Sequence, residues 1–120
     1  MKIDYELTKL ILEDIEEQSD GQKSIQVVAS KIQEGCSQEL VDYHLRILED
    51  DALIVVDDRL GAVGTTMISR LTAEGHRVLE AMRDDTFLNK LKSGSMGASA
   101  EALKQLPSMF MKMVLTGSAV

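Results

Sequence analysis

Apolar and acidic positions alternate through the start of the chain with the period of an α-helix. The apolar positions fall on one stripe, and Glu13, Glu16 and Glu17 lie away from it. The stripe consists of Ile3, Leu7, Leu10, Ile11 and Ile15. This pattern predicts a helix from about Asp4 to Gln18, which ends at a turn-forming cluster at residues 19–21.

Residues 24–34 have apolar positions that fit two different structures. Val27, Val28 and Ile32 would line one side of a short helix. Their β-branched side chains also suit an extended segment. The pattern slightly favours the helix.

A second amphipathic pattern follows Gly35, and Ser37 is a suitable N-cap for a helix that runs to about Asp51. One arc of this helix carries Leu40, Val41, His44, Leu45, Ile47 and Leu48. The opposite arc carries Gln38, Glu39, Asp42, Tyr43, Arg46 and Glu49. We therefore expect a helix with one buried side and one polar side on which acids predominate.

Two short β-rich runs, residues 52–61 and 61–72, are joined by a glycine-bearing turn and predict a hairpin. Thr72 then offers an N-cap for a helix over residues 73–83, with Glu74 in the first turn, where the helix dipole favours an acid. Gly75 lies on the same face as the apolar residues of this helix. A missing side chain on that face predicts a close approach to the neighbouring element.

The C-terminal part is predicted to contain two more helical segments. The first runs from about Asp85 to Leu91, with Asp85 as its N-cap, and ends at the small-residue run 93–100. The second is interrupted by Pro107, which acts as a kink or as the start of a new helix. Its apolar stripe consists of Ala102, Leu103, Leu106, Phe110, Met113 and Val114.

Residues 106–117 are apolar on almost every side, with Lys112 their only charge. Such a helix must be covered, either by the core of its own chain or by its twin in a homodimer. We favour the homodimer, and the residues expected at its interface are Leu103, Leu106, Met109, Phe110, Met113 and Val114.

The order helix, short element, helix, β-hairpin, helix is typical of a winged helix-turn-helix domain. The expected fold class is therefore mainly α with a small β-hairpin, namely a winged helix-turn-helix-like domain followed by C-terminal helices. We expect the winged-helix-like domain to span residues 1–92. Residues 93–120 are expected to be a linker and a helical segment that belongs to the same domain or forms a dimer interface.

Three stretches of the chain together carry a family resemblance: VDYHLRILEDDALI at 41–54, RLTAEGHRVLEAMRDDTFLNKLK at 70–92, and SAEALKQL at 99–106. They are similar to an uncharacterised family of small phage- and prophage-associated proteins, catalogued as domain of unknown function number 2513. Where this chain has Ala73, the family pattern has an aromatic residue, which concerns packing at the base of the hairpin. The resemblance implies a winged-helix-like domain and no established activity.

Composition narrows the class of protein further. The single cysteine, Cys36, excludes an internal disulfide. The N-terminus lacks the layout of a signal peptide, and the longest apolar-rich run, 109–115, is too short to span a bilayer. We expect a soluble, cytoplasmic protein with no membrane association.

Candidate catalytic and metal-binding residues are few. His44 lies on an apolar arc, so we expect a core histidine with one satisfied nitrogen rather than a ligand. His76 is expected to pair with a nearby acid or to cap the wing. Together with Cys36 these histidines lack the spacing of a zinc site, and the acid pairs at 57–58 and 84–85 are typical of solvated or capping residues. We expect no enzyme activity, no metal and no cofactor.

Charge is distributed unevenly along the chain. Residues 1–58 hold 15 acids and 5 bases, whereas residues 59–120 hold 5 acids and 8 bases. Two functions remain open. The first is a DNA-binding regulator of phage or prophage type, whose expected contacts to double-stranded DNA are Gln38, Tyr43, Arg46, Arg59, Arg70, Arg77, Lys90 and Lys92. The second is a protein–protein interaction domain that uses the acidic third helix and binds no DNA.

The sequence favours the DNA-binding interpretation narrowly, because regulation is the usual role of the fold. The charge of the third helix opposes it. Glu39, Asp42, Glu49 and Asp50 accompany a single Arg46 there, and acids near phosphate reduce affinity for DNA.

Overall fold

The computed structural model describes residues 3–58, 66–93, 103 and 105–116. Within them the chain is mainly helical with one small antiparallel hairpin, which confirms the predicted fold class at that level. The elements in chain order are α1 (Tyr5–Gln18), α2 (Ala29–Ile32), α3 (Gln38–Asp50), β1 (Ile54–Asp58), β2 (Met67–Leu71), α4 (Ala73–Met82), α5 (Asp85–Ser93) and α6 (Leu106–Thr116). This is the order from which a winged helix was predicted.

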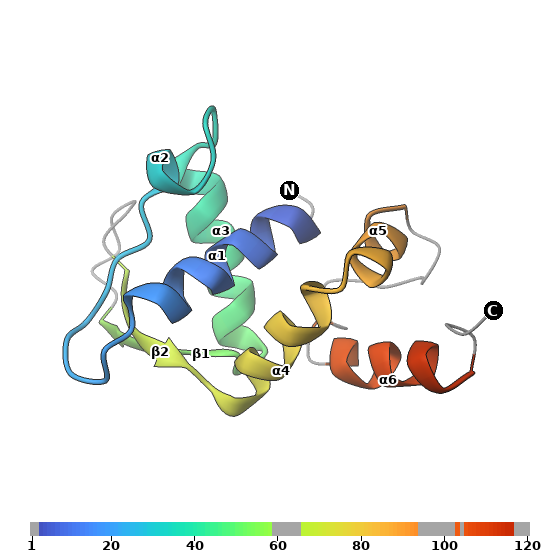
Figure 1. Ribbon diagram of the computed structural model, residues 1–120. Coiled ribbons are helices and arrows are strands. Elements are labelled where there is room, and N and C mark those ends of the chain that lie inside the picture. Colours follow the sequence, from blue (N-terminus) through green and yellow to red (C-terminus); the bar gives the residue numbers. More distant parts are fainter. Residues whose placement is uncertain (1–2, 59–65, 94–102, 104, 117–120) are drawn as a thin grey trace.

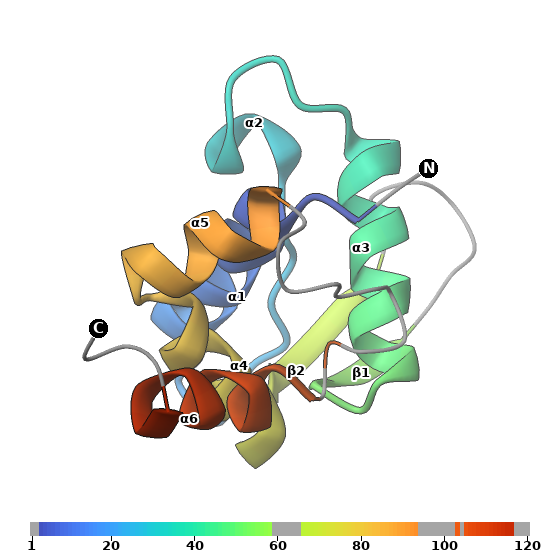
Figure 2. The ribbon, with the colours of Figure 1, turned by 90° about the vertical axis from the view of Figure 1, so that its right-hand side faces the viewer.

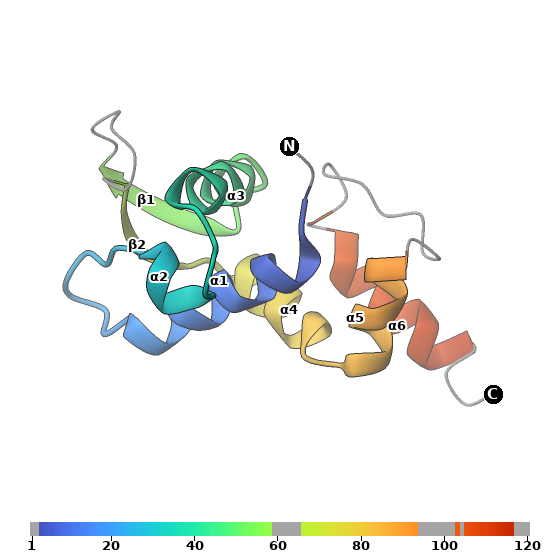
Figure 3. The same ribbon diagram turned by 90° about the horizontal axis from the view of Figure 1, so that it is seen from above.

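Helix α1 lies at the centre of the molecule and contacts α3, β2, α4 and α5. Figure 1 shows the hairpin at one end of the molecule, with α5 and α6 at the other. From above, α3 lies on one side of α1, and α5 and α6 lie beyond its N-terminal end (Figure 3). The fully buried residues of α1 are Leu7, Ile11, Leu12 and Ile15. The predicted stripe is therefore correct except that Leu12 is buried while Ile3 and Leu10 are only half-buried.

Two of the predicted helix caps are confirmed. The Ser37 hydroxyl accepts the backbone N–H of Leu40 at 3.1 Å, and the Thr72 hydroxyl accepts that of Gly75 at 3.0 Å. Thr72 also donates to the carbonyl of Ala52 at 2.7 Å. One threonine therefore starts α4 and ties it to the segment that leads into β1.

The predicted cap of α5 is off by one residue. The carboxylate of Asp84 accepts the N–H of Phe87 at 2.9 Å, whereas Asp85 lies in the first turn of the helix. The prediction that Asp85 is the cap was therefore wrong. Asp85 instead places its charge where the helix dipole favours an acid.

Residues 24–34 contain both of the structures that their sequence allows. Ile25 forms a β-bridge with Ile68 of β2, with backbone N–H to O distances of 2.7 and 2.8 Å. The chain then turns into the single turn of α2. The chain is extended at Ile25 because the backbone groups of this residue pair with β2.

Gly75 lies where α4 meets the chain that enters β1. A Cβ atom at this position would lie 2.1 Å from the carbonyl oxygen of Leu53. That oxygen also accepts the N–H of Thr72 at 2.9 Å, so it is held in place. The predicted close approach at Gly75 is confirmed.

Helix α6 packs against α4, and its Phe110 ring meets Phe87 of α5 edge to face with centroids 5.4 Å apart. Leu103 and Leu106, two residues of the predicted dimer interface, are buried in the core at 1% and 0% exposure. One side of this segment is therefore covered by its own chain. Pro107 lies in the first turn of α6, where its missing N–H leaves no helical bond unmade.

Across the residues that are described, none of the helices combines the length and the apolar character needed to cross a bilayer.

Candidate interaction surface on helix α3

The solvent-facing side of α3 is acidic. Val41, His44, Leu45 and Leu48 are buried, as the arc of apolar positions predicted. Exposed or half-buried on the other side are four acids and one base: Glu39, Asp42, Glu49, Asp50 and Arg46. We call these five residues the acidic face of α3. Acid in its first turn, at Glu39, also suits the N-terminal end of the helix dipole.

Gln38, the first residue of α3, uses its side-chain amide inside the chain. Its oxygen accepts the N–H of Ala29 at 2.9 Å. Its nitrogen donates to the carbonyl of Val27 at 3.0 Å and to the carboxylate of Asp42 at 3.1 Å. Because the N-cap of α2, Val28, makes no side-chain cap, Gln38 satisfies the start of α2 in its place. The amide predicted to contact DNA bases is thus occupied by these internal bonds.

His44 is buried at 1% exposure between α1 and α3, as predicted. The expectation that only one ring nitrogen is satisfied was wrong. Nε2 accepts the backbone N–H of Asp4 at 2.9 Å, and Nδ1 lies 2.8 Å from the carbonyl oxygen of Leu40. This arrangement requires the neutral tautomer with its proton on Nδ1. Tyr43, another predicted DNA contact, is half-buried with its ring edge-to-face against His44 at 5.6 Å.

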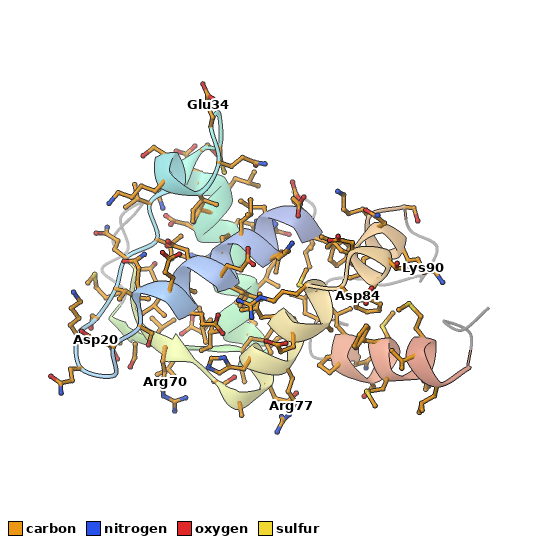
Figure 4. The ribbon with its side chains drawn as sticks, viewed as in Figure 1. Asp20, Glu34, Arg70, Arg77, Asp84 and Lys90 are labelled. Atoms are coloured by element: carbon orange, nitrogen blue, oxygen red, sulfur yellow. The ribbon has the colours of Figure 1, made fainter. Side chains whose placement is uncertain are left out.

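The basic residues predicted to bind DNA are spread over several elements. In Figure 4, Arg70 of β2 and Arg77 of α4 lie along the lower edge of the molecule, and Lys90 lies on α5 at the other end. Arg46 is exposed on α3 itself. Arg59 lies outside the described residues.

Several of these basic side chains already have partners within the chain. Arg77 pairs with Glu74 one turn away, and Lys92 lies 3.7 Å from Glu6. The guanidinium of Arg70 donates to the neighbouring backbone carbonyl of Leu71 at 3.0 Å. The two exposed ion pairs, of Arg77 and Lys92, are weak, but their acids lower the positive charge available to a phosphate backbone.

A separate charged cluster joins α1 to α4. Arg83 lies 2.7 Å from Glu16, 3.6 Å from Glu13 and 2.9 Å from Glu80. The hydrogen bond from Arg83 holds the pKa of the Glu16 carboxyl below its usual value. His76 lies 3.4 Å from the same carboxylate, which confirms its predicted pairing with an acid. Sequence reasoning missed Arg83, because two of its partners, Glu13 and Glu16, belong to α1, which is distant in sequence.

The candidate ligands among the described residues are not assembled into a metal site. Over the part of the chain that the structure describes, no three His, Cys, Asp or Glu side chains are grouped to hold a metal ion. Burial raises the pKa of the Cys36 thiol, so the reactive thiolate is disfavoured there.

Comparison with known proteins identifies the family of the chain. The family model described as "Hypothetical protein (DUF2513)" matches residues 2–101. The chain belongs to the DUF2513 family. The matched residues of this DUF2513 protein include α1 to α5 in full and end before α6.

A relative from Haemophilus influenzae (strain Rd), named "Uncharacterized protein", is 32% identical over 120 residues. The similarity covers 96% of this DUF2513 chain and 99% of that relative. No solved structure matches the chain. The resemblance seen in the sequence is confirmed for the family itself.

Proposed function

We propose that this protein is a winged-helix-like domain used for protein–protein interaction, with the acidic face of α3 as the contact surface for a basic partner. The composition of that face carries the proposal. The helix that a winged-helix protein normally places in the major groove here presents four acids and one arginine. Each acid brought near DNA phosphates opposes binding, whereas a basic protein surface is attracted to it.

The internal use of Gln38 supports the same proposal. A side-chain amide at the start of a recognition helix would suit adenine contacts. Here its hydrogen bonds to Ala29 and Val27 hold α2 in place. A base contact would have to break them.

A DNA-binding regulator is the second candidate, and two observations favour it. The element order is that of a winged helix, and Arg46 is exposed in the middle of α3. With Arg70 on the second hairpin strand, these residues would supply the first contacts to a duplex. A phage or prophage setting, a transcriptional role and a cytoplasmic location stay predictions. We propose no catalytic role.

Binding of two fluorescent probes, followed by anisotropy at low salt, tests the proposal. One probe is a random-sequence duplex DNA and the other is an oligo-arginine peptide. We expect the peptide to bind and the duplex to give no change. Glu39→Gln with Asp50→Asn should weaken peptide binding by roughly 2- to 30-fold, which corresponds to two exposed ion pairs.

The matched control removes the same charges elsewhere. Glu17 and Asp20 are exposed at the end of α1 and in the turn after it. Glu17→Gln with Asp20→Asn should leave peptide affinity close to that of the unmodified chain. Duplex binding that falls steeply with salt and is lost in Arg46→Ala would replace the proposal with the DNA-binding regulator.

A further inference from the structure

A groove of about 360 Å³ lies between α4 and α6. The two helices lie side by side in Figure 2. Its apolar lining comes from Ala81 of α4 and from Pro107, Phe110 and Met111 of α6. The groove is separate from the acidic face of α3, so its occupant is independent of the proposed function.

The face of α6 beside this groove is apolar and exposed. Met111, Val114 and Leu115 are exposed at 52%, 44% and 76%, and all three belong to α6. At 100° per residue they share an arc of roughly 140° with Phe110. The core uses a different side of the helix, where Leu106 is fully buried. Together with this buried side, the apolar part of α6 is wider than the stripe of about 100° with which a helix packs against one core.

The charged residues at the edge of the groove are paired within the chain. Arg77 pairs with Glu74. Glu80 lies 2.9 Å from Arg83, and His76 lies 3.4 Å from Glu16. These edges therefore offer little to attract a strongly charged peptide. The occupant they suit is apolar and nearly uncharged.

The α6 helix of a second copy has these properties. Its only charge is Lys112, which lies outside the apolar arc. The methionines of this helix are flexible enough to fit an irregular groove. A twofold pairing also places the same surface on both sides, so an apolar ridge beside an apolar groove is complementary to itself.

We propose that two copies of the chain associate about a twofold axis, with Met111, Val114 and Leu115 of each copy set against the α4–α6 groove of the other. The contact is one helix and one groove per copy, which is small for a protein interface. We therefore expect a dissociation constant on the order of micromolar.

Light scattering coupled to size exclusion tests this in the full chain at tens of micromolar. The unmodified chain, 13.2 kDa as a monomer, should elute with about twice that mass. Met111→Lys and Leu115→Lys should each weaken association at least roughly tenfold, because each buries an unpaired charge in the interface. A monomeric unmodified chain overturns the proposal.

Ser30→Lys is the matched control, because Ser30 is exposed on α2, a helix that contributes no residue to the lining of the groove. It should leave the dimer intact. Circular dichroism of each variant reports whether the fold survives. Leu115, the most exposed of the three apolar residues, gives the decisive variant. A dimer that persists in folded Leu115→Lys and Met111→Lys proteins also overturns the proposal.

Discussion

His44 shows how one buried polar side chain can connect two helices. Its Nε2 atom accepts the N–H of Asp4, the residue that caps α1, while its Nδ1 atom is bonded within α3. The apolar arc of α3 was sufficient to predict that His44 is buried. The arc could not identify Asp4 as its partner, because a contact between residues 40 apart depends on how the helices pack.

The substitution His44→Leu should lower the free energy of unfolding by on the order of 1–2 kcal/mol. Because the arc around His44 is apolar, the sequence by itself predicts that this variant keeps its fold intact, or nearly so. The structure changes that expectation, because leucine leaves the Asp4 N–H without its acceptor. Urea denaturation measures the loss, and hydrogen exchange at the Asp4 amide should become faster.

His76→Leu provides the control, because the His76 side chain is 53% exposed and pairs with Glu16 only at the surface. Its unfolding free energy should change by less than about 0.5 kcal/mol. Equal effects of the two substitutions would show that the Asp4 bond contributes nothing measurable.

At the scale of the elements, local signals predicted helix starts well and tertiary contacts poorly. Ser37 and Thr72 were recognised as caps because a hydroxyl before an apolar pattern satisfies the first N–H groups of a helix. The sequence led to Asp85 rather than Asp84 as the cap of α5, since both adjacent aspartates fit a cap and the local pattern does not distinguish them. Gln38 was placed on the polar side of α3. Its actual partners, the Ala29 N–H and the Val27 carbonyl, could not be predicted because they belong to a different segment.

The bonds of Gln38 predict that it stabilises α2 rather than a DNA complex. Gln38→Ala should lower the free energy of unfolding by about 1–2 kcal/mol, because the Ala29 N–H and the Val27 carbonyl lose their partner. Gln38→Glu should cost at least as much. Its carboxylate keeps an acceptor for Ala29 but faces the Val27 carbonyl and the Asp42 carboxylate.

Glu39→Ala, at the exposed neighbouring position, is the control for both Gln38 variants and should change stability by less than about 0.5 kcal/mol. Urea denaturation with hydrogen exchange at Ala29 separates the outcomes. If Gln38→Ala changed neither stability nor exchange, the bonds of Gln38 would not stabilise α2, and its amide would be available to a partner.

At the scale of the whole molecule, the sequence allowed the C-terminal segment to cover its own core or its twin, and it favoured the twin. The structure shows the first for one side of α6, where Leu106 is buried and Phe110 meets Phe87. The exposed side still has the apolar character from which a dimer was predicted. Which side of α6 is buried depends on the position of α4. The pattern of apolar residues in α6 does not predict that position.

The contact between Phe87 and Phe110 tests whether α6 packs on the chain to which it belongs. We expect a coupling of about 1 kcal/mol in a double-mutant cycle that changes each to leucine. Thermal or urea unfolding of the four proteins measures this coupling, all in the Leu115→Lys background so that dimer dissociation does not contribute.

A parallel cycle between Phe87 and Tyr43, whose ring packs on His44, is the control and should give a coupling within roughly 0.3 kcal/mol of zero. Coupling is retained in a monomer only if Phe87 and Phe110 belong to the same chain. Its disappearance there would instead mean that α6 packs on the core of a second copy.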